Sequence, residues 1–97
     1  MSKKAGVYKY LEVSTCHITE KDNKTLRTIQ HEQIPPVIVY PYEYGYWVVT
    51  PEKTRSLKVP LSKSFKKIVE KAWEVNAQII RLDRDAEVHE DLKIHNW

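Results

Sequence analysis

Residues Val37–Val49, VIVYPYEYGYWVV, decide the fold. This stretch holds half of the chain's ten aromatic residues and one of its two glycines. Valine, isoleucine, tyrosine and tryptophan suit a half-buried pleated surface, so the stretch predicts two strands of a hairpin folded around Tyr44-Gly45. Pro41 has no amide hydrogen for a ladder, which puts the first strand at an edge or at a bulge. The second strand, Tyr46–Val49, is the better candidate for a central position.

One strand and one helix are predicted before this hairpin. Val7–Val13 alternates apolar residues with polar or aromatic ones, which is typical of a strand with one buried face. Thr19-Glu20-Lys21-Asp22 has the pattern of a capping box, with Thr19 as the N-cap of a helix and Asp22 at its third position. The helix has a thin apolar stripe, Leu26 and Ile29, and should end before Pro35-Pro36.

A longer helix and a last strand are predicted after the hairpin. Ser62 or Ser64 can cap the helix, whose apolar side recurs with helical period at Phe65, Ile68, Val69, Ala72, Trp73 and Asn76. Gln78–Leu82 predicts the final strand, and residues 83–97 form a C-terminal extension whose Leu92, Ile94 and Trp97 can fold back. The order βαββαβ indicates an α+β fold of the ferredoxin-like type. We expect an antiparallel sheet with both helices on one face and the first and third strands in the middle.

Length and composition narrow the class of protein. A chain of 97 residues fits one α+β domain over residues 1–97, with a disordered start at residues 1–6. Eighteen apolar residues nowhere run together, and no apolar segment follows the basic start, so we expect a cytoplasmic protein. Cys16 is the only cysteine, which excludes an internal disulfide and a cysteine-based zinc site within one chain. We expect no cofactor and no small-molecule substrate.

Charge is distributed unevenly, although the net charge is only +3. From Lys53 to Lys71 there are seven basic residues against one acid, including Lys63, Lys66 and Lys67. From Asp83 to Asp91 five acids stand against one arginine. A basic segment can be a phosphate footprint, but on a small domain it is more often a solvated face.

Several short motifs in a fixed order resemble a known family. They are the Ser14-Thr15-Cys16-His17 motif, Tyr44-Gly45, the Asp83-Arg84-Asp85 segment and the closing Leu92 to Trp97. This order is similar to that of a family of small uncharacterised proteins carried by bacterial plasmids, phages and integrated elements. Its pattern has Ser-Thr-x-His, a Tyr-Gly strand, and Asp-x-Asp before a terminal Leu-Pro…Trp; here Lys93 replaces the proline. The resemblance implies a genomic setting and no mechanism.

Two groups of residues could form a catalytic nucleophile or a metal site, and each also has a simpler structural interpretation. Ser14, Thr15, Cys16 and His17 could suggest a nucleophile, but neighbours on a strand point to opposite faces, and no glycine-framed elbow is present. The plainer reading is that Ser14 or Thr15 bonds local backbone and a ring nitrogen of His17 holds a backbone carbonyl. Asp83 and Asp85 lie in an acidic segment but lack the spacing of a calcium or zinc site, so pairing with Arg84 or the lysines is favoured.

Aromatic residues give the binding hypotheses. Tyr8, Tyr10, Tyr44, Tyr46 and Trp47 would lie on or beside a sheet face without helices, where aromatic residues suit protein interfaces. We therefore expect a non-enzymatic protein of a mobile element that binds a protein partner or itself, with a host or rival defence system as one such partner. The alternative is single-stranded nucleic-acid binding, with bases stacked on the tyrosines and phosphates held by Lys53–Lys71.

Overall fold

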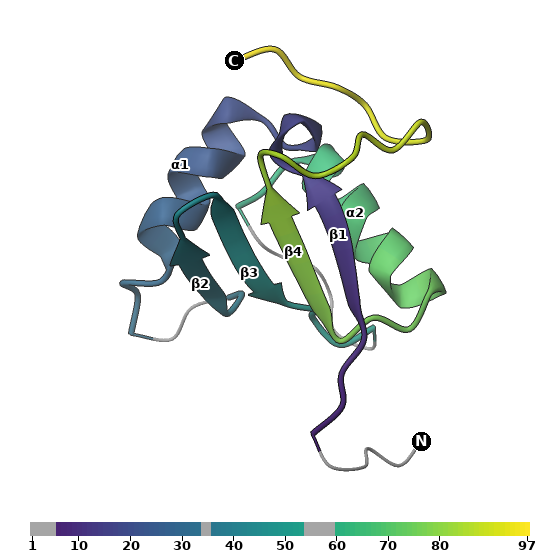
Figure 1. The fold of residues 1–97 in the computed structure, drawn as a ribbon. Coiled ribbons are helices and arrows are strands. Elements are labelled where there is room, and N and C mark those ends of the chain that lie inside the picture. Colours follow the sequence, from purple (N-terminus) through teal and green to yellow (C-terminus); the bar gives the residue numbers. More distant parts are fainter. Residues whose placement is uncertain (1–5, 34–35, 54–59) are drawn as a thin grey trace.

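The computed structural model describes residues 6–33, 36–53 and 60–97. Along them lie β1 (Tyr10–Ser14), a 3-10 turn η1 (Thr15–His17), α1 (Glu20–Ile29), β2 (Val39–Tyr42), β3 (Gly45–Val49), α2 (Lys63–Glu74) and β4 (Ile79–Asp83). The predicted α+β class, with the order βαββαβ, is confirmed for this part of the chain (Figure 1). The prediction of disorder at residues 1–6 falls almost entirely outside the described residues.

The four strands lie in the order β1-β4-β3-β2. β4 is parallel to β1 and antiparallel to β3. The ferredoxin-like arrangement is therefore not confirmed. β3 lies in the middle, as predicted, but the central position expected for β1 is wrong, because β4 takes it and pairs with β1 in parallel. On the side away from the helices, the side chains of Arg81 and Asp83 in β4 are 29% and 9% exposed, against 41% for Glu12 in β1, which suits an interior β4 and an edge β1.

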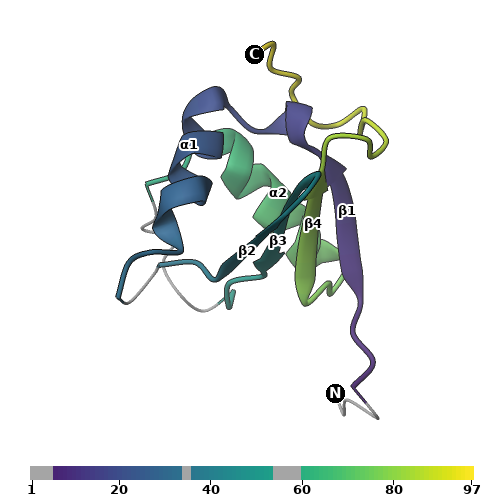
Figure 2. The same cartoon turned by 60° about the vertical axis from the view of Figure 1, so that its left-hand side comes forward.

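Both helices cover the same face of the sheet, as predicted (Figures 1 and 2). The core lies between the two layers. Buried side chains of the sheet, among them Val13, Val48, Ile80 and Leu82, meet buried side chains of the helices, among them Leu26, Ile29, Phe65, Ile68, Val69 and Ala72. No described element covers the opposite face, which is the nearer one in Figure 1.

Asp22 joins the beginnings of the two helices. Its Oδ2 accepts the backbone N–H of Thr19 at 3.1 Å, and its own N–H donates to the Thr19 hydroxyl oxygen at 2.9 Å, which confirms the predicted capping box. Ser62, the N-cap of α2, donates its backbone N–H to Oδ1 of Asp22 at 2.9 Å and its hydroxyl to Oδ2 at 2.5 Å. Asp22 is only 2% exposed. Since a buried carboxylate needs hydrogen-bond donors, these contacts fix the start of α1 against the start of α2.

α2 ends in a turn that leads directly into β4. Asn76 adopts the left-handed conformation with φ 58°, which asparagine tolerates better than most residues. The N–H of Asn76 donates to the carbonyl of Trp73 at 3.1 Å, and that of Ala77 to the carbonyl of Ala72 at 2.8 Å. This is the Schellman pattern of a helix end, and it reverses the chain so that β4 can enter the sheet.

The predicted hairpin is present, with Tyr42 opposite Gly45 and the turn at residues 43–44. β2 is an edge strand, as Pro41 predicted, and β3 lies between β2 and β4. Gly45 is required by close approach, because a Cβ atom there would collide with the carbonyl oxygen of Leu82 in β4.

Residues 84–97 run across one end of the sheet and return toward the corner between β1 and α1 (Figure 1). The N–H of His95 donates to the carbonyl of Cys16 at 2.7 Å, and the indole N–H of Trp97 donates to the carbonyl of Ile18 at 2.8 Å. Leu92 packs against the core. The tail therefore folds back, as predicted for Leu92 and Trp97. None of the helices in the described residues is long and apolar enough to cross a bilayer.

Replacing Asp22 by asparagine is expected to lower the free energy of unfolding by about 1–3 kcal/mol, because the amide NH₂ would face donors that the carboxylate now satisfies. Urea unfolding at neutral pH measures this change. Glu87→Gln, an exposed change of the same kind, is the matched control and should stay within about 0.5 kcal/mol of the wild type. Equal stability of both variants would contradict the role given to Asp22.

Candidate functional site

Side chains on the side of the sheet away from the helices form what we call the open face. Side chains alternate along each strand, so these residues occupy every second position between buried neighbours. The open face consists of Tyr10 and Glu12 of β1, Ile79, Arg81 and Asp83 of β4, Trp47 and Val49 of β3, and Tyr40 and Tyr42 of β2.

Arg81 is at the centre of the open face. Its Nη1 lies 3.0 Å from Oε2 of Glu12, its Nε donates to the hydroxyl of Tyr42 at 3.0 Å, and its Nη2 lies 3.4 Å from Oδ2 of Asp83. The guanidinium carbon also lies 5.3 Å from the ring centroid of Trp47. The register explains this meeting, because Arg81 is directly opposite Glu12 on one side and Trp47 on the other. These contacts hold the guanidinium in one orientation.

Tyr42 and Asp83 complete a group of polar side chains around Arg81 that also includes Glu12. We call this group the Arg81 cluster. The Tyr42 hydroxyl donates to Oδ2 of Asp83, and Oδ1 of Asp83 accepts the backbone N–H of Asp85 at 2.7 Å. Burial raises the pKa of Tyr42, and its hydrogen bond to Asp83 raises it further. The same hydrogen bond, followed by that from Asp85, lowers the pKa of Asp83. The bond to Tyr42 raises the pKa of Arg81. At neutral pH a neutral phenol therefore joins a carboxylate and a guanidinium.

The other half of the open face is apolar. Tyr10 and Trp47 meet edge to face, with ring centroids 5.5 Å apart. A hollow of about 290 Å³ with almost no polar lining is formed by Tyr40, Trp47, Val48, Val49 and Ile79. Tyr40 is 61% exposed, so this apolar half faces solvent. The open face thus joins an apolar hollow to a fixed arginine, which is a combination suited to binding.

Of the predicted aromatic residues, Tyr10 and Trp47 lie on the open face, and Tyr8 lies half exposed just before β1. Tyr44 is in the hairpin turn, with the guanidinium of Arg84 5.1 Å from its ring centroid. Tyr46 was predicted to bind and is instead buried, since it alternates with Trp47 and points into the helix layer. There its hydroxyl donates to Oδ1 of Asn23 at 2.8 Å.

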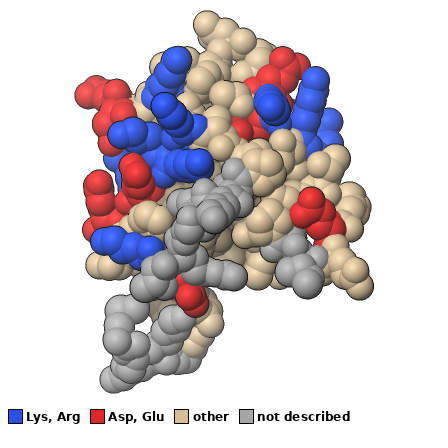
Figure 3. Space-filling model, turned by 180° about the vertical axis from the view of Figure 1, so that it is seen from behind, with Lys and Arg blue, Asp and Glu red and all other residues tan. Residues whose placement is uncertain are grey.

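The predicted lysines are on the other side of the molecule. Lys63, Lys66 and Lys67 belong to α2, which covers the face of the sheet opposite to the open face. Figure 3 looks at the helix side and shows basic side chains gathered there, with acids among them. Lys71 of the same helix pairs with Asp91 of the acidic tail at 2.7 Å. The lysines and the open-face aromatic residues therefore do not form one surface.

The Ser-Thr-x-His motif contacts backbone, as the plainer reading predicts. The Ser14 hydroxyl oxygen accepts the N–H of Cys16 at 3.2 Å. His17 is 1% exposed; its Nε2 accepts the N–H of His89 at 2.9 Å, so Nδ1 carries the hydrogen and donates to the carbonyl of Lys93, also at 2.9 Å. His17 thus adds two hydrogen bonds to those with which His95 and Trp97 hold the tail. Thr15 lines a separate cleft beside the hairpin.

Asp83 and Asp85 have separate surroundings. Asp83 belongs to the Arg81 cluster and lies opposite Ser14 in the sheet, whereas Asp85 is exposed and 3.9 Å from Arg84. Among the described residues, no three histidine, cysteine, aspartate or glutamate side chains gather closely enough to hold a metal ion.

Sequence reasoning missed Arg81, Tyr42, Tyr40 and Glu12. A signal was available, because Arg81 alternates with Ile80 and Leu82 and therefore had to face away from the core. Its partners could not be found in this way, since they depend on which strand lies next to β4.

Comparison with known proteins gives one match. A family model matches residues 10–97, and it describes the C-terminal domain of DUF5983, a family of unknown function. No curated protein and no solved structure matches the chain. The matched range begins with β1 and includes every described helix and strand.

Asp83→Asn is expected to remove an acid-sensitive part of the stability. The folded-state pKa of Asp83 is lowered, so its carboxylate stabilises the fold fully above the ordinary value of 3.8 and loses this effect as pH falls through the folded-state pKa. Urea midpoints should show the wild type above the variant at about pH 6, with the gap closing toward about pH 2. Asp85→Asn, at an exposed position, is the control. A gap that stays constant with pH would contradict this assignment.

His17→Phe is expected to loosen the tail while keeping a ring of similar size at the buried position. The N–H of His89 would lose its acceptor, so its hydrogen exchange should become at least about tenfold faster. NMR exchange at the His89 amide measures this, with amides of β4 as an internal reference. Unchanged exchange at His89 would show that His17 does not hold the tail.

Proposed function

Because the chain belongs to DUF5983, a family of unknown function, we propose its function from the surface that its own residues build. The protein is a non-enzymatic binding protein that contacts a protein partner with its open face. The single observation that carries this proposal is the ordered Arg81 cluster beside an apolar hollow, on a sheet face that no described element covers.

The composition of the open face supports a protein partner. Tyrosine, tryptophan and arginine are the residues that most often dominate the binding energy of protein interfaces. Here Tyr10, Tyr40, Trp47 and Arg81 lie within a few ångströms of one another or share the same hollow. The hollow, about 290 Å³ and lined almost wholly by apolar atoms, suits an aliphatic or aromatic side chain of the partner.

Order within the cluster also supports binding. Arg81 already contacts Glu12, Tyr42 and Asp83, so its rotamer is fixed before any partner arrives. Association then costs less side-chain entropy than it would with a freely moving arginine. Because the positive charge of Arg81 is already paired with Glu12 and Asp83, a partner need not supply a carboxylate to neutralise this charge.

Nucleic-acid binding is less well supported. The alternative required the tyrosines and the basic segment to act together, and Lys63, Lys66 and Lys67 belong to the helix layer behind the sheet. A single strand stacked on Tyr10 and Trp47 would therefore lie far from these phosphate contacts. Arg55 and Lys58 fall outside the described residues.

The genomic setting is part of the proposal. Resemblance of the Ser14–His17, Tyr44-Gly45 and Asp83–Asp85 motifs to small proteins of plasmids, phages and integrated elements supports an origin in a mobile element. Accessory proteins of such elements often bind host or rival machinery, so a component of a defence system in the host cytoplasm is the partner that we propose.

Val49→Asp places a charge in the apolar hollow and is expected to weaken partner binding at least about tenfold. Its matched control is Val88→Asp, an equally drastic change at an exposed valine of the tail. The tagged wild type and both variants are used to capture proteins from host lysate, and the recovered partner is titrated against each. The control should bind like the wild type.

Three results would contradict the proposal. The first is a wild type that is an inert monomer by light scattering and captures nothing. The second is a partner that binds Val49→Asp as tightly as it binds the wild type. The third is binding to a single-stranded oligonucleotide that weakens with salt and with Tyr10→Ala, which would establish the nucleic-acid alternative.

A further inference from the structure

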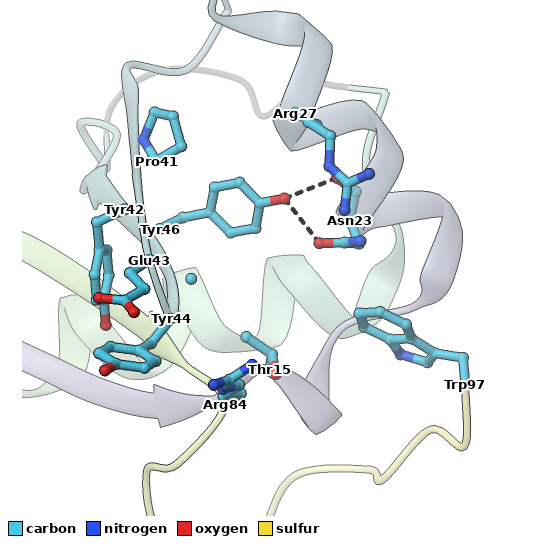
Figure 4. Close-up of a pocket in the computed structure, with 11 residues that line it drawn as sticks. Thr15, Asn23, Arg27, Pro41, Tyr42, Glu43, Tyr44, Tyr46, Arg84 and Trp97 are labelled. Atoms are coloured by element: carbon cyan, nitrogen blue, oxygen red, sulfur yellow. Dashed lines mark hydrogen bonds between the residues drawn. The ribbon is translucent and has the colours of Figure 1, made fainter.

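A second hollow lies beside the hairpin, outside the open face. It has a volume of about 400 Å³ and is formed by parts of the chain that are far apart in sequence: α1, the β2–β3 hairpin, the residue after β4, and the end of the tail (Figure 4). We call it the hairpin cleft. Its size is within the range of small-molecule sites, and it touches the open face only at Tyr42.

Two arginines from different elements line the hairpin cleft. Arg27 comes from α1 and Arg84 follows β4, and Figure 4 shows them on different sides of the hollow. Among the described residues, no carboxylate pairs with Arg27. Arg84 has one ionic contact, to Asp85 at 3.9 Å, and both side chains are more than 60% exposed, so this pair contributes little. Glu43 is the only acid among the described residues of the lining.

Arg84 is oriented by an aromatic ring. Its guanidinium carbon lies 5.1 Å from the centroid of Tyr44. A guanidinium that packs on a ring uses its face and keeps its N–H groups at the edge for an anion, where they can bind two oxygens at once. Contact with the Tyr44 ring therefore leaves the N–H groups of Arg84 available to hold a carboxylate or a phosphate group.

Trp97 supplies a flat wall. Its indole N–H donates to the carbonyl of Ile18 at 2.8 Å, which holds the ring at the cleft although the residue is 50% exposed. In Figure 4 the indole lies at the side of the hollow opposite to Tyr44. An exposed aromatic ring that is held by a hydrogen bond can stack on a planar ligand at little entropic cost.

The back of the cleft is polar and ordered. The Tyr46 hydroxyl donates to both oxygens of Asn23, at 2.8 Å to Oδ1 and 3.2 Å to the backbone oxygen (Figure 4). This bond fixes the amide of Asn23, whose NH₂ group has no partner among the described residues. It is a further donor next to Arg27, which lies one helical turn away on α1.

We propose that the hairpin cleft binds a small organic anion in which a carboxylate or phosphate group is joined to a flat ring, with Arg27 and Arg84 holding the anion and Trp97 or Tyr44 stacking on the ring. This inference goes beyond the proposed function and does not depend on it. Donors outnumber acids in the described lining, the two arginines come from separate parts of the chain, and the indole of Trp97 is held by its hydrogen bond to Ile18.

Phenyl phosphate and phenylacetate are the probes, because each joins a ring to one of the two anionic groups. NMR titration of the full chain at low salt follows the indole N–H of Trp97 and the amide group of Asn23. Saturable shifts with a dissociation constant of about 1 mM or tighter are expected for at least one probe. Inorganic phosphate, acetate and uncharged benzyl alcohol, which lack either ring or charge, should bind at least about tenfold more weakly.

Arg27→Gln and Arg84→Gln should each weaken probe binding at least about tenfold, and both positions are exposed, so the variants keep the fold. Lys67→Gln removes an exposed charge from α2 and should bind like the wild type. A preference for phenyl phosphate or for phenylacetate identifies the anionic group. The inference is overturned if neither probe gives saturable shifts, if both arginine variants bind normally, or if Lys67→Gln weakens binding equally.

Discussion

Asp22 is a buried carboxylate whose two oxygens accept hydrogens from the starts of both helices. Leaving such a group without donors in an apolar interior costs far more than an ordinary packing defect, so the two N-termini have to meet at this point. That constraint keeps α1 and α2 in one layer and gives the sheet its covered side. The open face is uncovered because both helices lie on the other side of the sheet.

Two surfaces follow from this one-sided arrangement. On the open face, β4 brings Arg81 between Glu12 of β1 and Trp47 of β3, and the apolar hollow lies next to it. Beyond β2, the hairpin faces α1 and the returning tail, and the hairpin cleft forms between them (Figure 4). The buried His17 helps to hold the tail in place. The last residue of that tail, Trp97, lines the hairpin cleft.

Two of the predicted binding residues were placed on the correct side of the sheet from the sequence. Tyr10 and Trp47 were expected on the uncovered side and lie there. Tyr46 was also expected to bind, although alternation with Trp47 puts it on the buried side. The nucleic-acid alternative required the lysines of α2 to lie beside the tyrosines, but a helix that covers one side of a sheet carries its polar face away from the other side.

The sequence by itself determined the elements and their caps. Local hydrogen bonds of Thr19, Asp22 and Ser62, and apolar repeats with strand or helix period, are contacts between near neighbours in the chain. Only the tertiary structure decided the lateral order of the strands, the Arg81 cluster and the hairpin cleft. The physical reason is that alternation specifies which face a side chain occupies but not which strand lies beside it. The parallel pairing of β1 with β4 joins residues about seventy positions apart, so no local pattern in the sequence specifies it.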